Sequence, residues 1–243
     1  MPPLFQFLLA GTALVVAGVV AIRVSGAEPR LARRLAGARQ LRVGDVLAAT
    51  VMPARPIRIV GRIRCPRPIV TDRDERLVAF HRDVQVRPPG GRWRSIERIR
   101  ESRGFELWDH DGSMPVDPVL AAEPLVVIPH VWRGTTAELT QEGHLAAVAR
   151  LGGSRESGWP ARSVTRMVSV VERLLVLASV QRGADGSATL VPPPGGFVIA
   201  GVDLDDAMRL LGGNRRWLLL AGYVLAVMGG LVGVGGVIGS IVR

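Results

Sequence analysis

Residues 105–118 read FELWDHDGSMPVDP, a stretch in which two alternating arms flank a turn. Phe105 and Leu107 are two positions apart, so both side chains fall on one face of a strand. The tetrapeptide Asp-His-Asp-Gly forms the reversal, and Met114 and Val116 return on the second arm. An Asp-x-Asp-Gly sequence between two such arms is a hairpin signal. The stretch therefore predicts a β-hairpin.

The residues around this hairpin also have a β-rich pattern. Short apolar runs separated by turn residues lie at 57–64, 77–87, 124–130 and 167–181. In the second run Val84 and Val86 alternate with polar residues, which is the period of a half-buried strand. Residues 137–153 fit one short helix. Seven or more short strands at this spacing predict a mainly β domain, a small barrel or sandwich, over residues 51–208.

Uncharged apolar segments lie on both sides of this domain. The chain is 48% apolar and 21% charged, and residues 4–22 and 217–242 carry no charge at all. The first segment corresponds to roughly 28 Å of helix, close to the roughly 30 Å of a bilayer's hydrocarbon core. We therefore expect a transmembrane helix on each side of the β domain, and an integral membrane protein with two spans.

A cleaved signal peptide is the other interpretation of the first segment, with cleavage within residues 1–27. A signal peptide begins with basic residues, whereas residues 1–3 are Met-Pro-Pro. The sequence therefore favours an uncleaved anchor, and cleavage stays an open alternative.

Residues 23–50 form a basic segment next to the first predicted span. Between Arg23 and Arg42 there are six arginines and a single glutamate, whereas only Arg243 follows the second span. Loops rich in Lys and Arg are retained on the cytoplasmic side of a membrane. The pattern predicts a cytoplasmic middle domain with both termini outside. A topology signal and linker is the favoured role of this segment, and the alternative is that its arginines meet membrane lipids.

The second apolar segment is rich in glycine. Four of its glycines form two small-xxx-small pairs, namely Gly229, Gly233, Gly235 and Gly239. This spacing lets two helix backbones approach closely. The favoured interpretation is packing against the first segment, and the alternative is homo-oligomerisation through the second segment.

The order of these pieces resembles the GIDE-type domain, the membrane-flanked β domain of mitochondrial RING-type E3 ubiquitin ligases and of many prokaryotic membrane proteins. The matching positions are Gly61, Phe80, Trp93, Phe105, Leu107, Asp109, Gly112, Val116 and Pro118. A glutamate ahead of an apolar strand, Glu172, follows in the same order. The resemblance spans roughly residues 45–240 and implies a β domain beside a membrane, in which these positions are structural.

The resemblance does not carry ligase activity with it. A RING domain needs about eight Cys and His ligands for its paired zinc sites, and this chain has one cysteine and four histidines. It also lacks a G-x-S-x-G elbow, a G-x-G-x-x-G loop and a P-loop. We therefore predict no catalytic residue, no cofactor and no metal site, and a protein that is not an enzyme.

Two clusters are interpreted as structural. Asp109, His110 and Asp111 are neighbours in a tight turn, where side chains splay apart, so a turn role is favoured over a metal site. Trp93 and Trp108 are expected in the core.

The net charge of +10 comes entirely from arginine, which supplies all 31 basic residues. The arginines are spread through the strands beside acidic residues, whereas a nucleic-acid interface is a clustered basic face. The spread of the charge therefore argues against nucleic acid as a partner. The sequence favours a membrane-anchored, non-enzymatic binding or scaffolding protein with an unidentified protein partner. The alternatives are a RING-less subunit of a ligase complex and a nucleic-acid-binding barrel.

Overall fold

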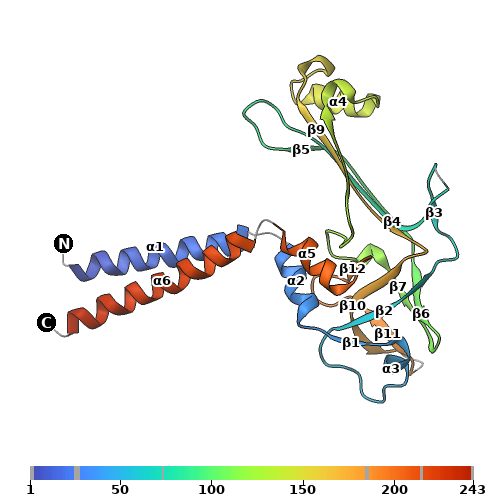
Figure 1. Ribbon diagram of the computed structural model, residues 1–243, viewed down its shortest axis with the longest axis horizontal. Helices are drawn as coiled ribbons and strands as arrows, with labels where there is room; N and C mark the ends of the chain where they lie inside the picture. Colours follow the sequence, from blue (N-terminus) through green and yellow to red (C-terminus); the bar gives the residue numbers. More distant parts are fainter. Residues whose placement is uncertain (1–2, 25–27, 73, 184–185, 214–215, 242–243) are drawn as a thin grey trace. The chain divides into compact units, whose positions relative to one another are not determined.

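The computed structural model of the chain describes residues 3–24, 28–72, 74–183, 186–213 and 216–241 (Figure 1). The chain divides into two compact units. The larger is the continuous stretch Gly37–Ala207, and the smaller combines Met1–Ala36 with Met208–Arg243.

The first sheet of the larger unit is nearly closed into a barrel. Its strands are β1 (Arg39–Leu41), β2 (Ile57–Arg64), β6 (Phe105–Asp109), β7 (Gly112–Val116), β10 (Arg173–Arg182), β11 (Ala188–Val191) and β12 (Val198–Ala200). The main order is β11-β10-β2-β6-β7, with β1 parallel to β2 and β12 antiparallel to β10. The two ends of this order, β11 and β7, lie near each other. The core inside includes Ile59, Met114 and Phe197.

The predicted hairpin is confirmed as β6 and β7. Phe105 pairs with Val116 and Leu107 with Met114, and all four side chains are buried in the core. Alternation of apolar residues around a short turn is sufficient to place both arms, because every second side chain of a strand points to the same face.

The turn of this hairpin holds a short helix, α3 (Val43–Leu47), against the sheet. One oxygen of Asp109 accepts a hydrogen bond from the backbone N–H of Val43 at 3.1 Å, and the other accepts from the N–H of Asp111 at 2.9 Å. Gly112 has φ +154°, and a Cβ there would collide with the Leu47 side chain. The structure thus gives Asp109 and Gly112 a structural role.

The second sheet carries the remaining strands. They are β3 (Ile69–Val70), β4 (Arg76–Val86), β5 (Arg94–Ser102), β8 (His130–Thr135) and β9 (Pro160–Ser169). The order is β3-β4-β9-β8, and β5 also pairs with β4. In Figure 1, β4, β5 and β9 form a long ribbon that reaches the helix α4 (Glu142–Arg150). The helix lies within the residues predicted to hold one.

A second, smaller hydrophobic cluster lies at the α4 end of this ribbon. It contains Val84, Val86, Leu139, Val148, Trp159 and Ala161. Three short 3-10 helices complete the larger unit, η1 (Pro118–Leu120), η2 (Thr136–Glu138) and η3 (Arg155–Ser157). The cluster explains why the alternating valines of β4 are buried far from the barrel core.

Two sequence predictions differ from the structure in ways that shape the site. The run 167–181 is not one element, because the chain leaves β9 after Ser169, turns, and enters β10 of the other sheet at Arg173. Residues 124–130 do not form a regular strand, and Val126 makes only an isolated bridge to Ala200. Prolines at both ends of that run supply no N–H to a ladder.

The two tryptophans expected in the core are only half-buried. The Arg64 guanidinium lies 5.2 Å from the Trp108 ring centre, and the Arg162 guanidinium lies 4.3 Å from that of Trp93. Each indole therefore packs against a positive charge rather than in the apolar interior.

The smaller unit contains α1 (Pro3–Val24), α2 (Glu28–Ala36) and α6 (Arg216–Ile241), and α5 (Leu204–Gly212) spans the boundary between the units. Helices α1 and α6 lie side by side (Figure 1). A Cβ on Gly229 would come within 2.6 Å of the Gly11 carbonyl oxygen, so glycine permits the close approach. The surroundings of Gly233, Gly235 and Gly239 lie outside the described residues.

The prediction of a transmembrane helix at each end is wrong. In the part of the chain that the structure describes, no helix is long and apolar enough to cross a bilayer, which takes about 20 consecutive apolar residues. The predicted spans at 4–22 and 217–242 supported the integral-membrane assignment, the cytoplasmic placement of the middle domain and the lipid contacts of residues 23–50. These assignments are not retained.

The role of Asp109 can be tested by unfolding. Replacing Asp109 with Ala removes two acceptors for backbone N–H groups, and we expect a loss of about 1–2 kcal/mol in the free energy of unfolding. Asp109→Asn keeps one acceptor oxygen and should lose less. Urea denaturation of the intact chain measures both, with the exposed loop variant Asp72→Ala as the control. Equal stability of Asp109→Ala and Asp72→Ala would contradict the assignment.

Candidate functional site

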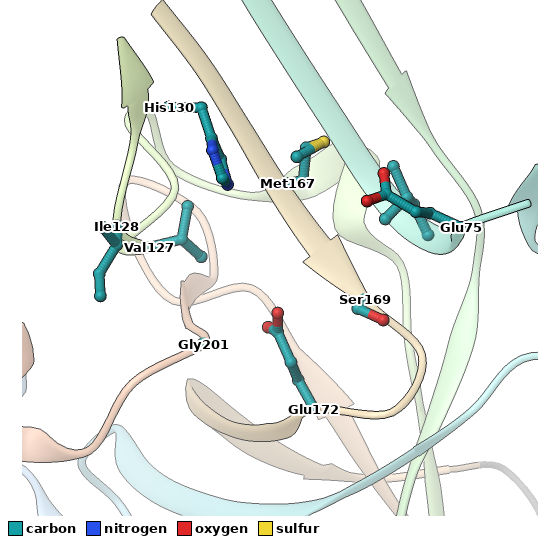
Figure 2. Close-up of a pocket in the computed structure, with 9 residues that line it drawn as sticks. Glu75, Val127, Ile128, His130, Met167, Ser169, Glu172 and Gly201 are labelled. Atoms are coloured by element: carbon teal, nitrogen blue, oxygen red, sulfur yellow. The ribbon is translucent and has the colours of Figure 1, made fainter. Parts of the chain in front are cut away.

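A cavity of about 300 Å³ lies where the chain passes from β9 to β10 (Figure 2). Its apolar lining comes from Leu77, Val127, Ile128 and Met167. Its polar lining comes from Glu75, His130, Ser169 and Glu172, and Gly201 completes it. The volume is near the lower limit of small-molecule pockets.

Segments that are distant in sequence bring these side chains together. Strand β4 contributes Leu77, β9 contributes Met167 and Ser169, and His130 is the first residue of β8. Glu172 belongs to the turn between β9 and β10. Its backbone N–H donates to the Ser169 carbonyl at 3.2 Å, so the turn is tight. The glutamate is thereby held at the junction of the two sheets.

Glu172 is the unusual group of the cavity. Its Oε2 atom is buried, and it has no hydrogen-bond partner among the described residues. Burial raises the pKa of the Glu172 carboxyl above its ordinary value of 4.5, against a smaller opposing effect of the Ser169 backbone. Buried polar atoms are nearly always hydrogen-bonded, so an orphaned carboxylate oxygen beside a cavity marks a candidate functional group.

Gly201 makes room for this carboxylate. A Cβ at position 201 would come 2.6 Å from Glu172 Oε2 and 3.0 Å from Val127 Cγ1. The first of these separations is shorter than a normal van der Waals contact, so any larger residue would displace the Glu172 side chain. Figure 2 shows the carboxylate of Glu172 close to Gly201 and directed toward the part of the cavity beside Val127 and Met167.

The serine and histidine of the cavity are not joined into a catalytic pair. Ser169 Oγ donates to the Arg76 carbonyl at 3.4 Å and accepts from the Val171 N–H at 3.4 Å. Within the described residues, no hydrogen bond links the Ser169 hydroxyl to the side chain of His130 or Glu172. A serine nucleophile requires a base within hydrogen-bond reach, and the structure does not present that geometry.

The cavity chemistry suits recognition of a positive charge. Glu172 and Glu75 supply carboxylates, while the apolar lining suits a hydrocarbon stem. In the described part of the chain, no three His, Cys, Asp or Glu side chains gather closely enough to hold a metal ion. The two carboxylates and the apolar lining together favour an organic cation with an apolar stem.

Apart from Glu172, none of the residues predicted from the family resemblance lines this cavity. Phe105 to Val116 form the hairpin, and Pro118 begins η1. Gly61 faces Leu107, whose Cγ would lie 2.8 Å from a Cβ at position 61. Phe80 is the cross-strand partner of Met167, which lines the cavity.

No sequence pattern predicts Glu75, His130, Met167 or Ser169 as site residues, and Glu172 is predicted only as a position of the family resemblance. One signal was present. Glu172 and Arg173 are the charged pair inside the apolar run 167–181. A charge that interrupts a buried strand pattern marks either a turn or a functional group, and here it marks a turn that also lines the candidate site.

The raised pKa of Glu172 has a consequence for stability. The folded state holds the proton more tightly than the unfolded state, so the free energy of unfolding falls as pH rises from about 4.5 through the raised pKa. Glu172→Gln removes the ionisation. We expect this variant to be more stable than the unsubstituted protein at pH 7, and the difference to shrink toward pH 4.

Urea denaturation of the intact chain across this pH range measures the difference. Glu101→Gln, which changes an exposed carboxylate on β5 outside the cavity, is the matched control. A Glu172→Gln protein that is less stable at pH 7 would contradict the prediction, because it would show that the partners of the carboxylate outweigh the effect of its burial.

A comparison with known proteins identified no protein similar to this chain. No protein-family model matches the chain, and no curated protein or solved structure is significantly similar to it. The resemblance to the GIDE-type domain has no support from these comparisons and stays a prediction.

Proposed function

We propose that this chain is a non-enzymatic binding protein, and that its β unit receives a basic side chain of a protein partner in the cavity at Glu172. The observation that carries the proposal is the buried Oε2 atom of Glu172, which lacks a hydrogen-bond donor within the described chain. A lysine or arginine side chain supplies both the missing donor and the opposite charge.

The energetics favour a cation over a neutral ligand. A buried carboxylate without a donor is unfavourable by roughly 1–3 kcal/mol, and more when it is charged. An opposite charge at 4 Å offsets such a cost, since the attraction is of order 4 kcal/mol at an effective dielectric constant of 20. A neutral ligand of the same shape contributes only the apolar part of the contact.

The size and lining of the cavity agree with a side chain as the occupant. A volume of about 300 Å³ holds a small amine or one long side chain. Leu77, Val127 and Met167 supply apolar surface for a methylene stem. Lysine and arginine place such a stem along apolar surface and keep the charged head at a polar group.

A free sheet edge beside the cavity supports a protein as the source of that side chain. Strand β8 begins at His130, pairs with β9, and has no partner on its other side among the described strands. Val131 and Trp132 on this strand are 45% and 40% exposed. Extended peptides add to open edges of this kind, which would place one of their side chains near the cavity.

A lysine analogue and its uncharged counterpart test the proposal directly. With the methionine methyl groups labelled with ¹³C, Met167 reports on the cavity by NMR. We expect Nα-acetyl-lysine methylamide to shift this signal in a saturable way and Nα-acetyl-norleucine methylamide, which lacks the ammonium group, to leave it unchanged. Binding should weaken as pH falls through the raised pKa of Glu172, because the protonated carboxyl has no charge.

Two variants make the test specific. Glu172→Gln should abolish the response to the lysine analogue, and Gly201→Ala should weaken it by displacing the carboxylate. Glu101→Gln should respond like the unsubstituted protein. Equal responses to the lysine and norleucine analogues, or a full response in Glu172→Gln, would contradict the proposal.

A further inference from the structure

A second polar cavity lies farther along the ribbon of β4, β5 and β9. Its volume is about 270 Å³. Three arginines line it, Arg100, Arg162 and Arg166, together with two carboxylates, those of Asp83 and Glu123. The cavity therefore has an excess of positive charge.

Strand register places these groups on one face of the sheet. His81 of β4 lies opposite Arg100 of β5 on one side and Arg166 of β9 on the other. Gln85 lies opposite Arg162 in the same way. Directly opposed residues of neighbouring strands point to the same side of a sheet, so the positive groups flank the histidine from two strands.

Both carboxylates are already engaged by other groups of the protein. Glu123 Oε1 lies 2.6 Å from Arg100 Nε. Asp83 Oδ2 accepts from Gln85 Nε2 at 2.9 Å and lies 4.0 Å from Arg98 Nη2. These contacts shield the negative charges, so they oppose an incoming anion less than free carboxylates would.

Arg162 is held in a defined orientation. Its Nε donates to Gln85 Oε1 at 2.8 Å, and its guanidinium lies 4.3 Å from the centre of the Trp93 ring. Arg87 also lies 5.5 Å from that ring. The indole therefore packs against two arginines, and the hydrogen bond to Gln85 uses only one of the nitrogens of Arg162.

We infer that this cavity is a binding site for a phosphoryl group, either free phosphate or a small phosphate ester, held by Arg162 and Arg166. A phosphoryl group carries up to two negative charges on three equivalent oxygens, and planar guanidinium groups donate to such oxygens in pairs. Arginines fixed by neighbouring groups lose less side-chain freedom when the ligand arrives. The inference is independent of the cavity at Glu172, which has the opposite charge.

His81 provides a built-in reporter for this site. Burial and the charge of Arg100 lower its pKa to about 4; Glu123 acts in the other direction, and Arg166 lowers the pKa by a smaller amount. A bound phosphoryl group would counter the charge of the two arginines. The pKa of His81 should therefore rise, by about one unit or more, when the anion binds.

The experiment follows the His81 ring by NMR in the intact protein over pH 3.5–7. Inorganic phosphate and glycerol 3-phosphate are the two probes, and sodium chloride at matched ionic strength is the control for screening. We expect a saturable rise in the pKa of His81 with at least one phosphate and no such rise with chloride. A response to the ester alone assigns an organic phosphate, and a response to both assigns the phosphoryl group itself.

Substitutions identify the residues responsible. Arg162 is not among the charges that lower the pKa of His81, so Arg162→Gln should leave the resting value unchanged and weaken the phosphate response several-fold. Arg166→Gln should raise the resting value and abolish the further rise. Arg173→Gln, an exposed arginine on β10, is the control. No response to either phosphate, or unchanged responses in both the Arg162 and Arg166 variants, would overturn the inference.

Discussion

The turn between Ser169 and Arg173 is the constraint on which the β unit depends. On one side of it β9 pairs with β4 and β8, and on the other side β10 pairs with β2, β11 and β12. The two long strands thus belong to different sheets, although three residues separate them. The Val170 N–H donates to the Arg76 carbonyl at 2.9 Å, which ties the turn to the start of β4. The backbone of Glu172 is held at the junction of the two sheets, because the strands on both sides fix it.

Two glutamates of the same unit show how differently the fold treats one chemical group. Glu97 Oε2 accepts from Arg82 Nε at 2.9 Å and Nη2 at 2.6 Å, and its Oε1 lies 3.2 Å from His144 Nε2. Burial acts to raise the pKa of Glu97, but Arg82 and His144 outweigh it and lower the pKa. The ionised Glu97 carboxylate therefore stabilises the fold at pH values above its ordinary pKa. This stabilisation is lost as the pH falls through the lowered pKa. Glu172 has the opposite shift, because burial raises its pKa and the Ser169 backbone opposes this only in part.

The contrast bears on function. A charged group whose partners all lie within the chain is explained by its contribution to stability. Glu97 is such a group, since its contacts accompany the packing of α4 against β5. A buried carboxylate oxygen that lacks a donor and faces a cavity is not explained in this way, and such groups concentrate at sites that bind ligands. The arginines behave similarly, because strand register turns a dispersed set of basic residues into a face with excess positive charge at Arg162 and Arg166. The same ribbon thus presents an acidic and a basic cavity at different points along its length.

The sequence by itself determined the local elements of this protein. The hairpin, the alternation of Val84 and Val86, and the short helix α4 follow from patterns that neighbouring residues supply, because periodicity decides which side chains share a face. The uncharged segments at the two ends do form helices. Their apolar composition alone, however, led to the prediction of membrane spans, which the described helices do not support. Only the tertiary structure decided which sheet each strand joined. The cavities require long-range pairing, since Glu75, Val127, Glu172 and Gly201 meet only when four separate segments fold together, and no local pattern encodes such a meeting.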